Sequence, residues 1–334
     1  MNDRIEPKRV RALGLCSGGL DSILSALVLR RQGVHVEWVT FETPFFASRK
    51  ARQASEHVGV PLHVREITTD YLKMLTNPPA GYGKNMNPCL DCHALMFKKA
   101  GELMRELNFD FLFSGEVRGQ RPMSQNTNAL GYVAKNSGFG DHILRPLSAL
   151  CLPATPMEQN GLVDRRQLLD FSGRSRKPQI AWAQEMGITR YPAPAGGCLL
   201  TDKGFSGRLK DLFDHHSGYA VSDLHLLKHG RHMRLTPQAK IVVGRTQQDN
   251  ERIMRHCDAR KDVVIRGKDY PGPTVVLPGG APQAVRLLAG AICAGYGKSP
   301  QSATVRVEVT QAGETETISV LPIPPGDARR YLIR

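Results

Sequence analysis

The sequence predicts an α/β protein with a doubly wound, mostly parallel sheet, followed by a smaller α+β domain. Up to about residue 213, apolar runs typical of buried strands alternate with segments typical of helices, which is the pattern of a parallel sheet covered on both faces. Beyond about residue 225, short strand-like runs dominate and end in a hairpin around Ala312 and Gly313. We therefore expect two domains, at 1–215 and 225–330, joined by a linker near 215–225.

The clearest local signal lies at residues 10–31. An apolar strand runs into Ser17-Gly18-Gly19-Leu20-Asp21-Ser22, and a helix follows over 23–31. Backbone N–H groups and the helix dipole favour an anion at such a turn, and the glycines let it approach closely. The serine hydroxyls can donate to phosphate, and Asp21 is placed to hold Mg²⁺. The spacing is not that of a Walker motif. It resembles the pyrophosphate loop (PP-loop) of enzymes that split ATP into AMP and pyrophosphate, the alternative being a turn that only caps the helix.

The remaining elements of the first domain continue the alternation of strands and helices. Strands are expected over 34–41, 62–67, 109–113 and 143–147, and helices over 48–58, 94–107, 166–171, 179–186 and 207–213. Ligands bind beyond the carboxyl ends of strands in open α/β sheets. The residues at the end of the second strand, Phe41 and Thr43, are therefore candidate adenine contacts. With all of residues 17–22 and with Gly115 and Gln120, which the resemblance described below implies, they make up the expected ATP contacts. Residues 117–142 are polar and rich in Gly and Asn, which indicates a loop.

In the second domain, strands are expected over 239–243, 263–265, 273–277, 304–309 and 316–320, and helices over 248–256 and 283–293.

Two Pro- and Gly-rich loops carry cysteines. Cys89 and Cys92 lie in the loop predicted over 76–93, and Cys198 lies in the loop over 191–200. The sequence Cys-Leu-Asp-Cys-His matches a c-type haem attachment site, which needs an export signal that the N-terminus lacks. The cysteines could instead hold zinc together with His93, act as a redox pair, or bind an iron–sulfur cluster through three thiolates. Three thiolates leave one iron of a cubane open to bind sulfide or substrate. Cys16, Cys151, Cys257 and Cys293 are expected to be structural.

The charge and composition of the chain restrict the kinds of partner it can bind. The formal net charge is +14 and the pI is about 9.7, which favours a polyanion such as nucleic acid. Residues 228–269 hold eleven Lys or Arg and five Asp or Glu, a net charge of +6. No apolar run is long enough to span a membrane. Without a signal peptide either, we expect a cytoplasmic protein that does not contact membranes.

Several motifs in the right order resemble the PP-loop tRNA thiolases over about residues 10–213. Asn87-Pro88-Cys89-Leu90-Asp91-Cys92 and Gly197-Cys198 are similar to segments of the 2-thiouridylases. Residues 115–125 resemble the Gly-Glu-x-x-Gly-Gln-x-x-Ser-Gln signature of the 4-thiouridine synthetases, with one residue inserted, and residues 144–147 resemble their Leu-Arg-Pro-Leu. That family usually carries a THUMP domain before the PP-loop and often a rhodanese domain, and neither is seen here. The three-cysteine layout resembles the iron–sulfur-dependent branch.

The C-terminal part resembles a second family. Residues 241–253 and 264–273 are similar to the RNA-binding domain of the NFACT ribosome-quality-control proteins. Basic side chains there would contact phosphates without reading sequence, the alternative being a solvated basic surface. The expected RNA contacts are Arg118, Ser124, Gln125, Arg231, Arg234, Arg245, Arg252, Arg266 and Lys268.

Together the resemblances imply a tRNA uridine thiolase that uses ATP, Mg²⁺ and a 4Fe–4S cluster held by Cys89, Cys92 and Cys198. With Asp21, these cysteines are the expected catalytic residues. A uracil oxygen would be adenylated and then replaced by sulfur, with 4-thiouridine favoured. The partners implied are tRNA and a sulfur donor, either sulfide or a cysteine desulfurase, and a homodimer is left open. The alternatives are a cluster-free thiolase with a persulfide on Cys198, an RNA-binding protein without catalysis, and a PP-loop ligase acting on a small molecule.

Overall fold

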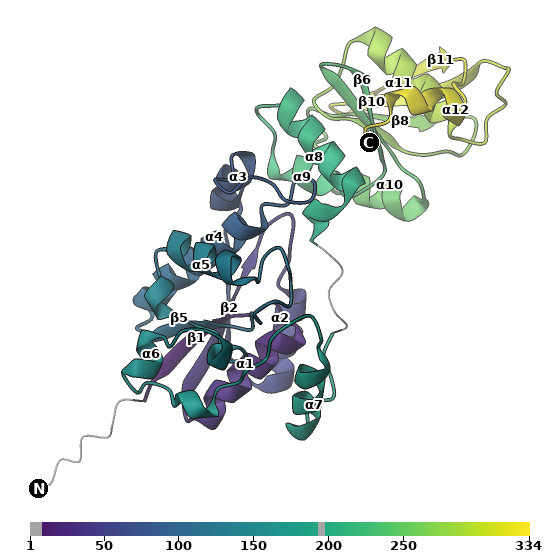
Figure 1. Ribbon diagram of the computed structural model, residues 1–334. Coiled ribbons are helices and arrows are strands. Elements are labelled where there is room, and N and C mark those ends of the chain that lie inside the picture. Colours follow the sequence, from purple (N-terminus) through teal and green to yellow (C-terminus); the bar gives the residue numbers. More distant parts are fainter. Residues whose placement is uncertain (1–8, 193–197) are drawn as a thin grey trace, which may run out of the picture. The chain divides into compact units, whose positions relative to one another are not determined.

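The computed structural model describes residues 9–192 and 198–334 in two units, Met1–Cys198 and Leu199–Arg334 (Figure 1). The division lies before the linker region expected near 215–225, because helix α8 (Lys203–His215) packs within the second unit. Asp211 of α8 forms an ion pair with Arg234, with 2.6 Å between Oδ2 and Nη2. Gly207 of the same helix lies against the carbonyl of Arg334, where a Cβ would come within 2.2 Å.

The N-terminal unit contains a five-stranded parallel sheet, which confirms the predicted α/β class. Its strand order is β3-β2-β1-β4-β5, and every neighbouring pair is parallel. The strands are β1 (Arg11–Leu15), β2 (His35–Glu42), β3 (Leu62–Glu66), β4 (Phe111–Ser114) and β5 (Ile143–Leu144). From β1 the chain first adds β2 and β3 on one side of β1, and then adds β4 and β5 on the other side. The gap between β1 and β4 is therefore the switch point where such sheets bind ligands.

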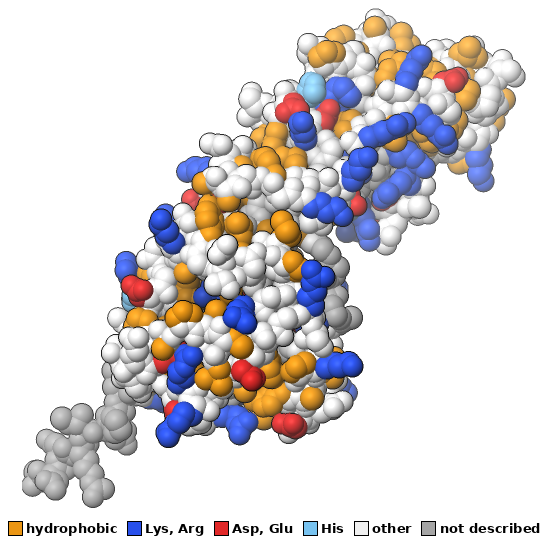
Figure 2. Space-filling model, viewed as in Figure 1, with side chains coloured by type: hydrophobic (Ala, Val, Ile, Leu, Met, Phe, Trp, Pro, Cys, Tyr) orange, Lys and Arg blue, Asp and Glu red, His pale blue; other side chains and the backbone are white. Residues whose placement is uncertain are grey.

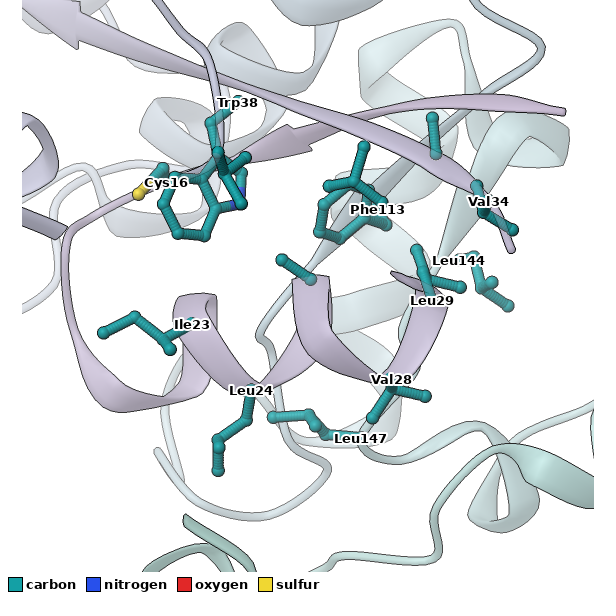
Figure 3. Close-up of a cluster of buried hydrophobic side chains, with 14 of the residues drawn as sticks. Cys16, Ile23, Leu24, Val28, Leu29, Val34, Trp38, Phe113, Leu144 and Leu147 are labelled. Atoms are coloured by element: carbon teal, nitrogen blue, oxygen red, sulfur yellow. The ribbon is translucent and has the colours of Figure 1, made fainter. Parts of the chain in front are cut away.

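Helices cover both faces of this sheet. They are α1 (Leu20–Arg31), α2 (Arg49–Val58), α3 (Thr68–Thr76), α4 (Cys89–Glu106), α5 (Thr127–Ser137), α6 (Pro156–Gln159) and α7 (Lys177–Glu185). On one face, apolar side chains of α1 pack against Trp38 and Phe113, which Figure 3 shows directly. On the other face, α4 and α5 pack over Leu112. Strand side chains alternate between the two cores, as the two-residue period of a strand requires.

Three local predictions in this unit are wrong. The stretch 166–171 forms only the 3₁₀ turn Arg165–Gln167, because the amides of Leu169 and Phe171 donate to the carbonyls of residues 146 and 147 rather than within a helix. The polar stretch 117–142 contains helix α5, whose first turn is capped by the Asn126 side chain. The long loop ends at Pro88, so the Cys-x-x-Cys pair lies on the first turn of α4 and not in the loop.

The C-terminal unit has a six-stranded sheet whose neighbouring strands all pair antiparallel, in the order β11-β10-β8-β9-β7-β6. The strands are β6 (Arg231–Thr236), β7 (Ala239–Val243), β8 (Val263–Gly267), β9 (Val275–Leu277), β10 (Val305–Gln311) and β11 (Glu314–Val320). The predicted α+β class and the hairpin at Ala312 and Gly313 are confirmed. Strand β6 was not expected from the sequence.

Helices pack on both faces of this second sheet. Besides α8, they are α9 (Val221–Leu226), α10 (Gln247–Met254), α11 (Gln283–Gly295) and α12 (Pro325–Ala328). Ile292 of α11 packs with Ile265 and Val307 on one face. Leu226 and Ile253, from α9 and α10, pack with Val242 on the other. In the described part of the chain, no helix has the length and apolar character needed to cross a membrane.

Candidate active site

A cavity of about 300 Å³ opens at the carboxyl ends of β1, β2 and β4. Among its lining residues are six of the expected ATP contacts: Ser17, Asp21, Ser22, Phe41, Gly115 and Gln120. Gln125, His93 and Glu116 belong to the same wall. Because the cavity lies at the switch point of the sheet, its position is the one that physical rules assign to a ligand of this fold.

The loop before α1 presents donors to this cavity. The Ser17 and Ser22 hydroxyls lie 3.0 Å apart across the turn. Gly19 caps α1 without a side-chain hydrogen bond, so the first-turn amides point toward an incoming anion. Gly18 has a φ of +74°, and a Cβ there would come within 2.3 Å of the Lys50 backbone. The loop therefore needs glycine at this position both for its backbone angle and for close packing.

Gly115 offers a test of this geometry. A Cβ at Gly115 would come within 2.4 Å of the Asp21 backbone carbon and 2.7 Å of the Ser22 nitrogen. We expect Gly115→Ala to displace the loop and to weaken ATP binding by at least about tenfold in isothermal titration calorimetry. Gly131→Ala is the matched control, because nothing lies within 4 Å of a Cβ at that helical position. Equal affinity in both variants would contradict the tight packing of the loop.

Asp21 lies at the centre of a polar network in this wall. Its Oδ2 accepts from Gln120 Nε2 at 2.9 Å and lies 3.5 Å from Arg176 Nη2. Gln179 Nε2 donates in turn to Gln120 Oε1 at 2.9 Å. Asp21 Oδ1, Arg176 Nε and Gln179 Oε1 are buried without a partner among the described residues. Buried polar groups are nearly always satisfied, so these atoms indicate a polar ligand or ion that completes the site.

Arg176 and Gln179 were not expected at the site from the sequence. Arg176 precedes α7 in a basic linker, and Gln179 is 1% exposed on that helix. Arg176 lies about 155 residues from Asp21 in the chain, and Gln179 reaches the network through Gln120; local patterns do not encode such contacts. The only sign of this contact in the sequence was a glutamine, Gln179, within the apolar pattern of a short predicted helix.

A second polar network joins the cavity to Cys89, the first cysteine of the Cys-x-x-Cys pair. His93 Nδ1 lies 3.0 Å from Glu116 Oε1, and Arg145 Nε donates to Glu116 Oε2 at 2.9 Å. Glu116 and Arg145 are 6% and 8% exposed. Burial alone raises the pKa of Glu116, but the Arg145 charge and the His93 hydrogen bond outweigh it and lower the pKa to about 2. The carboxylate is therefore ionised and holds the His93 ring in place.

Cys89 is the activated thiol of this arrangement. Burial raises its pKa, but hydrogen bonds from His93 and Ser124, with the His93 and Arg121 charges, lower it overall. In turn, burial lowers the pKa of His93, and its contacts with Cys89 and Glu116 raise it to about 10. Thiol, imidazole and carboxylate thus form the chain of contacts that favours a thiolate paired with an imidazolium.

The other two cysteines lie at the same end of the unit. Cys92 is hydrogen bonded to Tyr71, and burial together with the charges of Cys198 and Cys89 raises its pKa to about 12. The charge of Cys198 also contributes to raising the pKa of the buried Tyr71. Cys198 is exposed and Cys89 and Cys92 are partly exposed. The three thiols are thus close enough to influence one another's ionisation.

These thiols do not form a ready single-ion site. Within residues 9–192 and 198–334, no group of three or more His, Cys, Asp or Glu side chains is arranged to hold a metal ion. His93, the expected fourth ligand of a zinc site, is held by Cys89 and Glu116 instead.

Several expected contacts lie away from the cavity. Leu20 is fully buried in the core, so only its backbone can reach a nucleotide. Thr43 forms a β-bridge with Phe46, and its hydroxyl accepts from the Phe45 amide. Arg118 donates to the Cys151 carbonyl at 3.2 Å. Ser124 is 4% exposed and hydrogen bonded to Cys89, so its side chain is buried and does not lie on an open RNA surface. Gly197 lies outside the described residues.

The expected RNA contacts of the C-terminal unit differ in their surroundings. Arg234 and Arg245 are paired with Asp211 and Asp249. Arg231 lies over the Tyr296 ring at 4.9 Å. The other three, Arg252, Arg266 and Lys268, are exposed or partly exposed. Figure 2 shows Lys and Arg side chains gathered on one face of this unit, over α10 and its neighbours.

A five-stranded parallel sheet, a glycine turn at the first helix and a cavity at the switch point together form the arrangement expected of an α/β unit of the PP-loop type. Residues 8–151 match the family model of the thiamine biosynthesis protein ThiI, and residues 230–332 match that of the NFACT protein RNA binding domain. The first unit is thus similar to the ThiI family over residues 8–151, and the second to the NFACT RNA binding domain over residues 230–332.

Curated relatives share part of the first domain. A tRNA-specific 2-thiouridylase MnmA from Syntrophotalea carbinolica is 30% identical over 127 residues, which is 33% of this chain and 36% of that protein. A probable tRNA sulfurtransferase from Caldanaerobacter subterraneus subsp. tengcongensis is 27% identical over 171 residues, 48% of this chain and 40% of that protein. The chain thus spans 36% and 40% of these relatives' lengths. A solved 4-thiouridine synthetase–RNA complex with bound ATP has a TM-score of 0.38 and 20% identity, covering 54% of this chain and 41% of that one.

Proposed function

We propose that this protein is an ATP-dependent tRNA sulfurtransferase that thiolates a uridine. The observation that carries the proposal is the shared cavity: the PP-loop with Asp21 forms one part of its wall, and His93, the partner of Cys89, forms another together with Glu116, which holds His93. In this proposal, the site that activates ATP lies beside the histidine that contacts the Cys89 thiol. Such proximity is what a two-step replacement of oxygen by sulfur requires.

The first step would use the phosphate side of the cavity. ATP places its pyrophosphate on residues 17–22, Mg²⁺ is held near Asp21, and the adenine lies toward Phe41. The uracil oxygen attacks the α-phosphate, the bond to pyrophosphate breaks, and the base becomes adenylated. Arg176, which lies beside Asp21, would stabilise charge on the phosphates. The uracil must leave the helical stack to reach the cavity.

The second step would use the cysteines. Sulfur replaces the activated oxygen of the base and AMP leaves with that oxygen. We assign Cys89, Cys92 and Cys198 as ligands of a 4Fe–4S cluster, because soft thiolates suit iron and the three lie at one end of the unit. When bound, the cluster would supply an iron without a cysteine ligand, able to hold sulfide. Within the chain, His93 and Arg121 favour the Cys89 thiolate, and Tyr71 is hydrogen bonded to Cys92.

One observation favours the cluster-free alternative. Cys89 begins α4, and a thiol at a helix N-terminus with a histidine partner is the usual arrangement of a reactive dithiol. In that case a persulfide on Cys198 delivers its outer sulfur, and Cys89 or Cys92 closes a disulfide with Cys198 as the sulfur leaves. An external dithiol would then be needed to reduce the disulfide after each turnover.

The cysteines separate adenylation from sulfur transfer. We expect Cys89→Ser, Cys92→Ser and Cys198→Ser each to abolish thiolated nucleoside formation while tRNA-dependent pyrophosphate release persists, because none of the three lines the phosphate part of the cavity. Cys257→Ser, in the other unit, is the matched control. Iron and acid-labile sulfide are measured after anaerobic purification. A colourless protein that is fully active would exclude the cluster and leave the persulfide.

The activity itself is tested with the full chain, ATP and unmodified tRNA. Pyrophosphate release that depends on tRNA is the expected result, and mass spectrometry of nucleosides from a deletion strain should show the loss of one thiolated uridine, with 4-thiouridine favoured. Pyrophosphate release with a small molecule in place of tRNA would indicate a ligase. Tight tRNA binding without pyrophosphate release would indicate an RNA-binding protein without catalysis.

A further inference from the structure

Three histidines of the C-terminal unit stack their rings in parallel. His225 lies on α9, His229 in the turn that follows it, and His256 just beyond α10. The His256 ring is 5.2 Å from His225 with an interplanar angle of 11°, and 5.8 Å from His229 with an angle of 4°. All three side chains are partly exposed. We refer to His225, His229 and His256 as the histidine stack.

Positive groups surround the histidine stack. Lys228 Nζ lies 3.3 Å from His225 Nδ1, and the charges of Arg252 and Arg255 reach His229 and His256. The charge of Asp249 acts to raise the pKa of His229, but this carboxylate is already bonded to Arg245. No carboxylate pairs with Lys228, Arg252 or Arg255 in the described part of the chain. The surroundings of the stack therefore carry an excess of positive charge.

This environment keeps the imidazoles neutral. Burial lowers the pKa of each histidine, and the charge of Lys228 and of the neighbouring groups lowers it further. Burial also lowers the pKa of Lys228. Three neutral rings beside uncompensated cations form a surface that gains most from a nearby polyanion, because the anion neutralises the cations and favours protonation of the rings.

We propose that the histidine stack binds the phosphate backbone of RNA and takes up protons as it does so. The proposal rests on the proposed function in taking tRNA as the partner. Phosphate contacts of this kind hold RNA in place without reading sequence. The stack would add to the exposed Arg252 a set of contacts whose charge appears only when RNA is present.

The sign of the pH dependence follows from linkage. A bound phosphate raises the pKa values that the free protein holds low, so the complex carries more protons than the separate molecules. Affinity must then increase as the pH falls. An uptake of roughly half a proton across the range would tighten binding by about tenfold between about pH 8 and about pH 6.

The test uses the full chain and an unmodified tRNA transcript at constant ionic strength. Kd is measured by fluorescence anisotropy across that pH range, and proton uptake by calorimetry in buffers of different ionisation enthalpy. In the His225→Gln/His229→Gln/His256→Gln variant, we expect proton uptake to disappear and the tenfold pH dependence to flatten. His216→Gln, an exposed histidine of the same unit, is the control. If the triple variant does not fold, His256→Gln alone removes the central ring.

The outcomes separate this proposal from the proposed function. If the variant binds tRNA with unchanged proton uptake, the stack does not contact the backbone, and tRNA thiolation is unaffected by that result. If the wild-type chain binds no tRNA at any pH, the proposed function itself fails. If poly-glutamate competes as well as RNA does at equal charge, the surface recognises acidic protein and the assignment to RNA is overturned.

Discussion

Replacing Asp21 with asparagine is expected to slow tRNA-dependent pyrophosphate release by about 10²- to 10³-fold. The substitution keeps the size of the side chain, and an amide oxygen can still accept from Gln120. It removes the negative charge that Mg²⁺ and Arg176 require. One of the two carboxylate oxygens, Oδ1, is buried without a partner among the described residues. The rate is measured with saturating ATP and Mg²⁺, so that weaker binding is not mistaken for slower chemistry.

Asp141→Asn is the matched control for this variant, since Asp141 is exposed and does not line the cavity. A wild-type rate for Asp21→Asn would mean that the carboxylate only orders Gln120 and the loop. The phosphate site would then depend on the backbone amides and serines alone, and the place proposed for Mg²⁺ would be lost with it.

The sequence predicted the parts of the site that are local in the chain. A strand, a glycine turn and a helix follow one another within about twenty residues, so their geometry is set by neighbours. The same holds for the parallel sheet, because alternating strands and helices leave few ways to cover an apolar sheet. The Cys-x-x-Cys pair was also visible, but the prolines and glycines of residues 76–93, Pro88 among them, led to its prediction within a loop. Proline before a helix start is compatible with the helix, and this ambiguity misplaced the pair.

The parts of the candidate site that the sequence did not predict depend on contacts between segments that are distant in the chain. His93, Glu116 and Arg145 come from α4, from the segment after β4 and from the segment after β5, and only the folded sheet brings them together. Arg145 was seen only as a member of a motif, with no assigned partner. The activation of Cys89 follows from this network and cannot be read from cysteine spacing. Residues 143–147 and 115–125 are therefore expected to influence the ionisation of the Cys89 thiol as well as the binding of the nucleotide.

Replacing Glu116 with glutamine is expected to destabilise the N-terminal unit by about 3–5 kcal/mol. The change leaves the Arg145 guanidinium buried without its counter-charge and replaces the carboxylate that holds His93 with a neutral amide. Both tryptophans of the chain, Trp38 and Trp182, lie in this unit, so tryptophan fluorescence in a urea titration reports its unfolding alone. Glu102→Gln, which alters an exposed pair with Lys99, should cost no more than about 1 kcal/mol.

The pH dependence gives the same substitution an independent readout. The folded pKa of Glu116, about 2, lies below its ordinary value of 4.5, so the carboxylate contributes stability that is present above about pH 4.5 and lost as the pH falls toward about 2. Glu116→Gln should therefore remove part of the acid sensitivity of the unit in that range. If the variant is as stable as the wild type and just as acid-sensitive, Arg145 must find another partner. The Cys89 thiolate would then depend on His93 without a carboxylate to orient it.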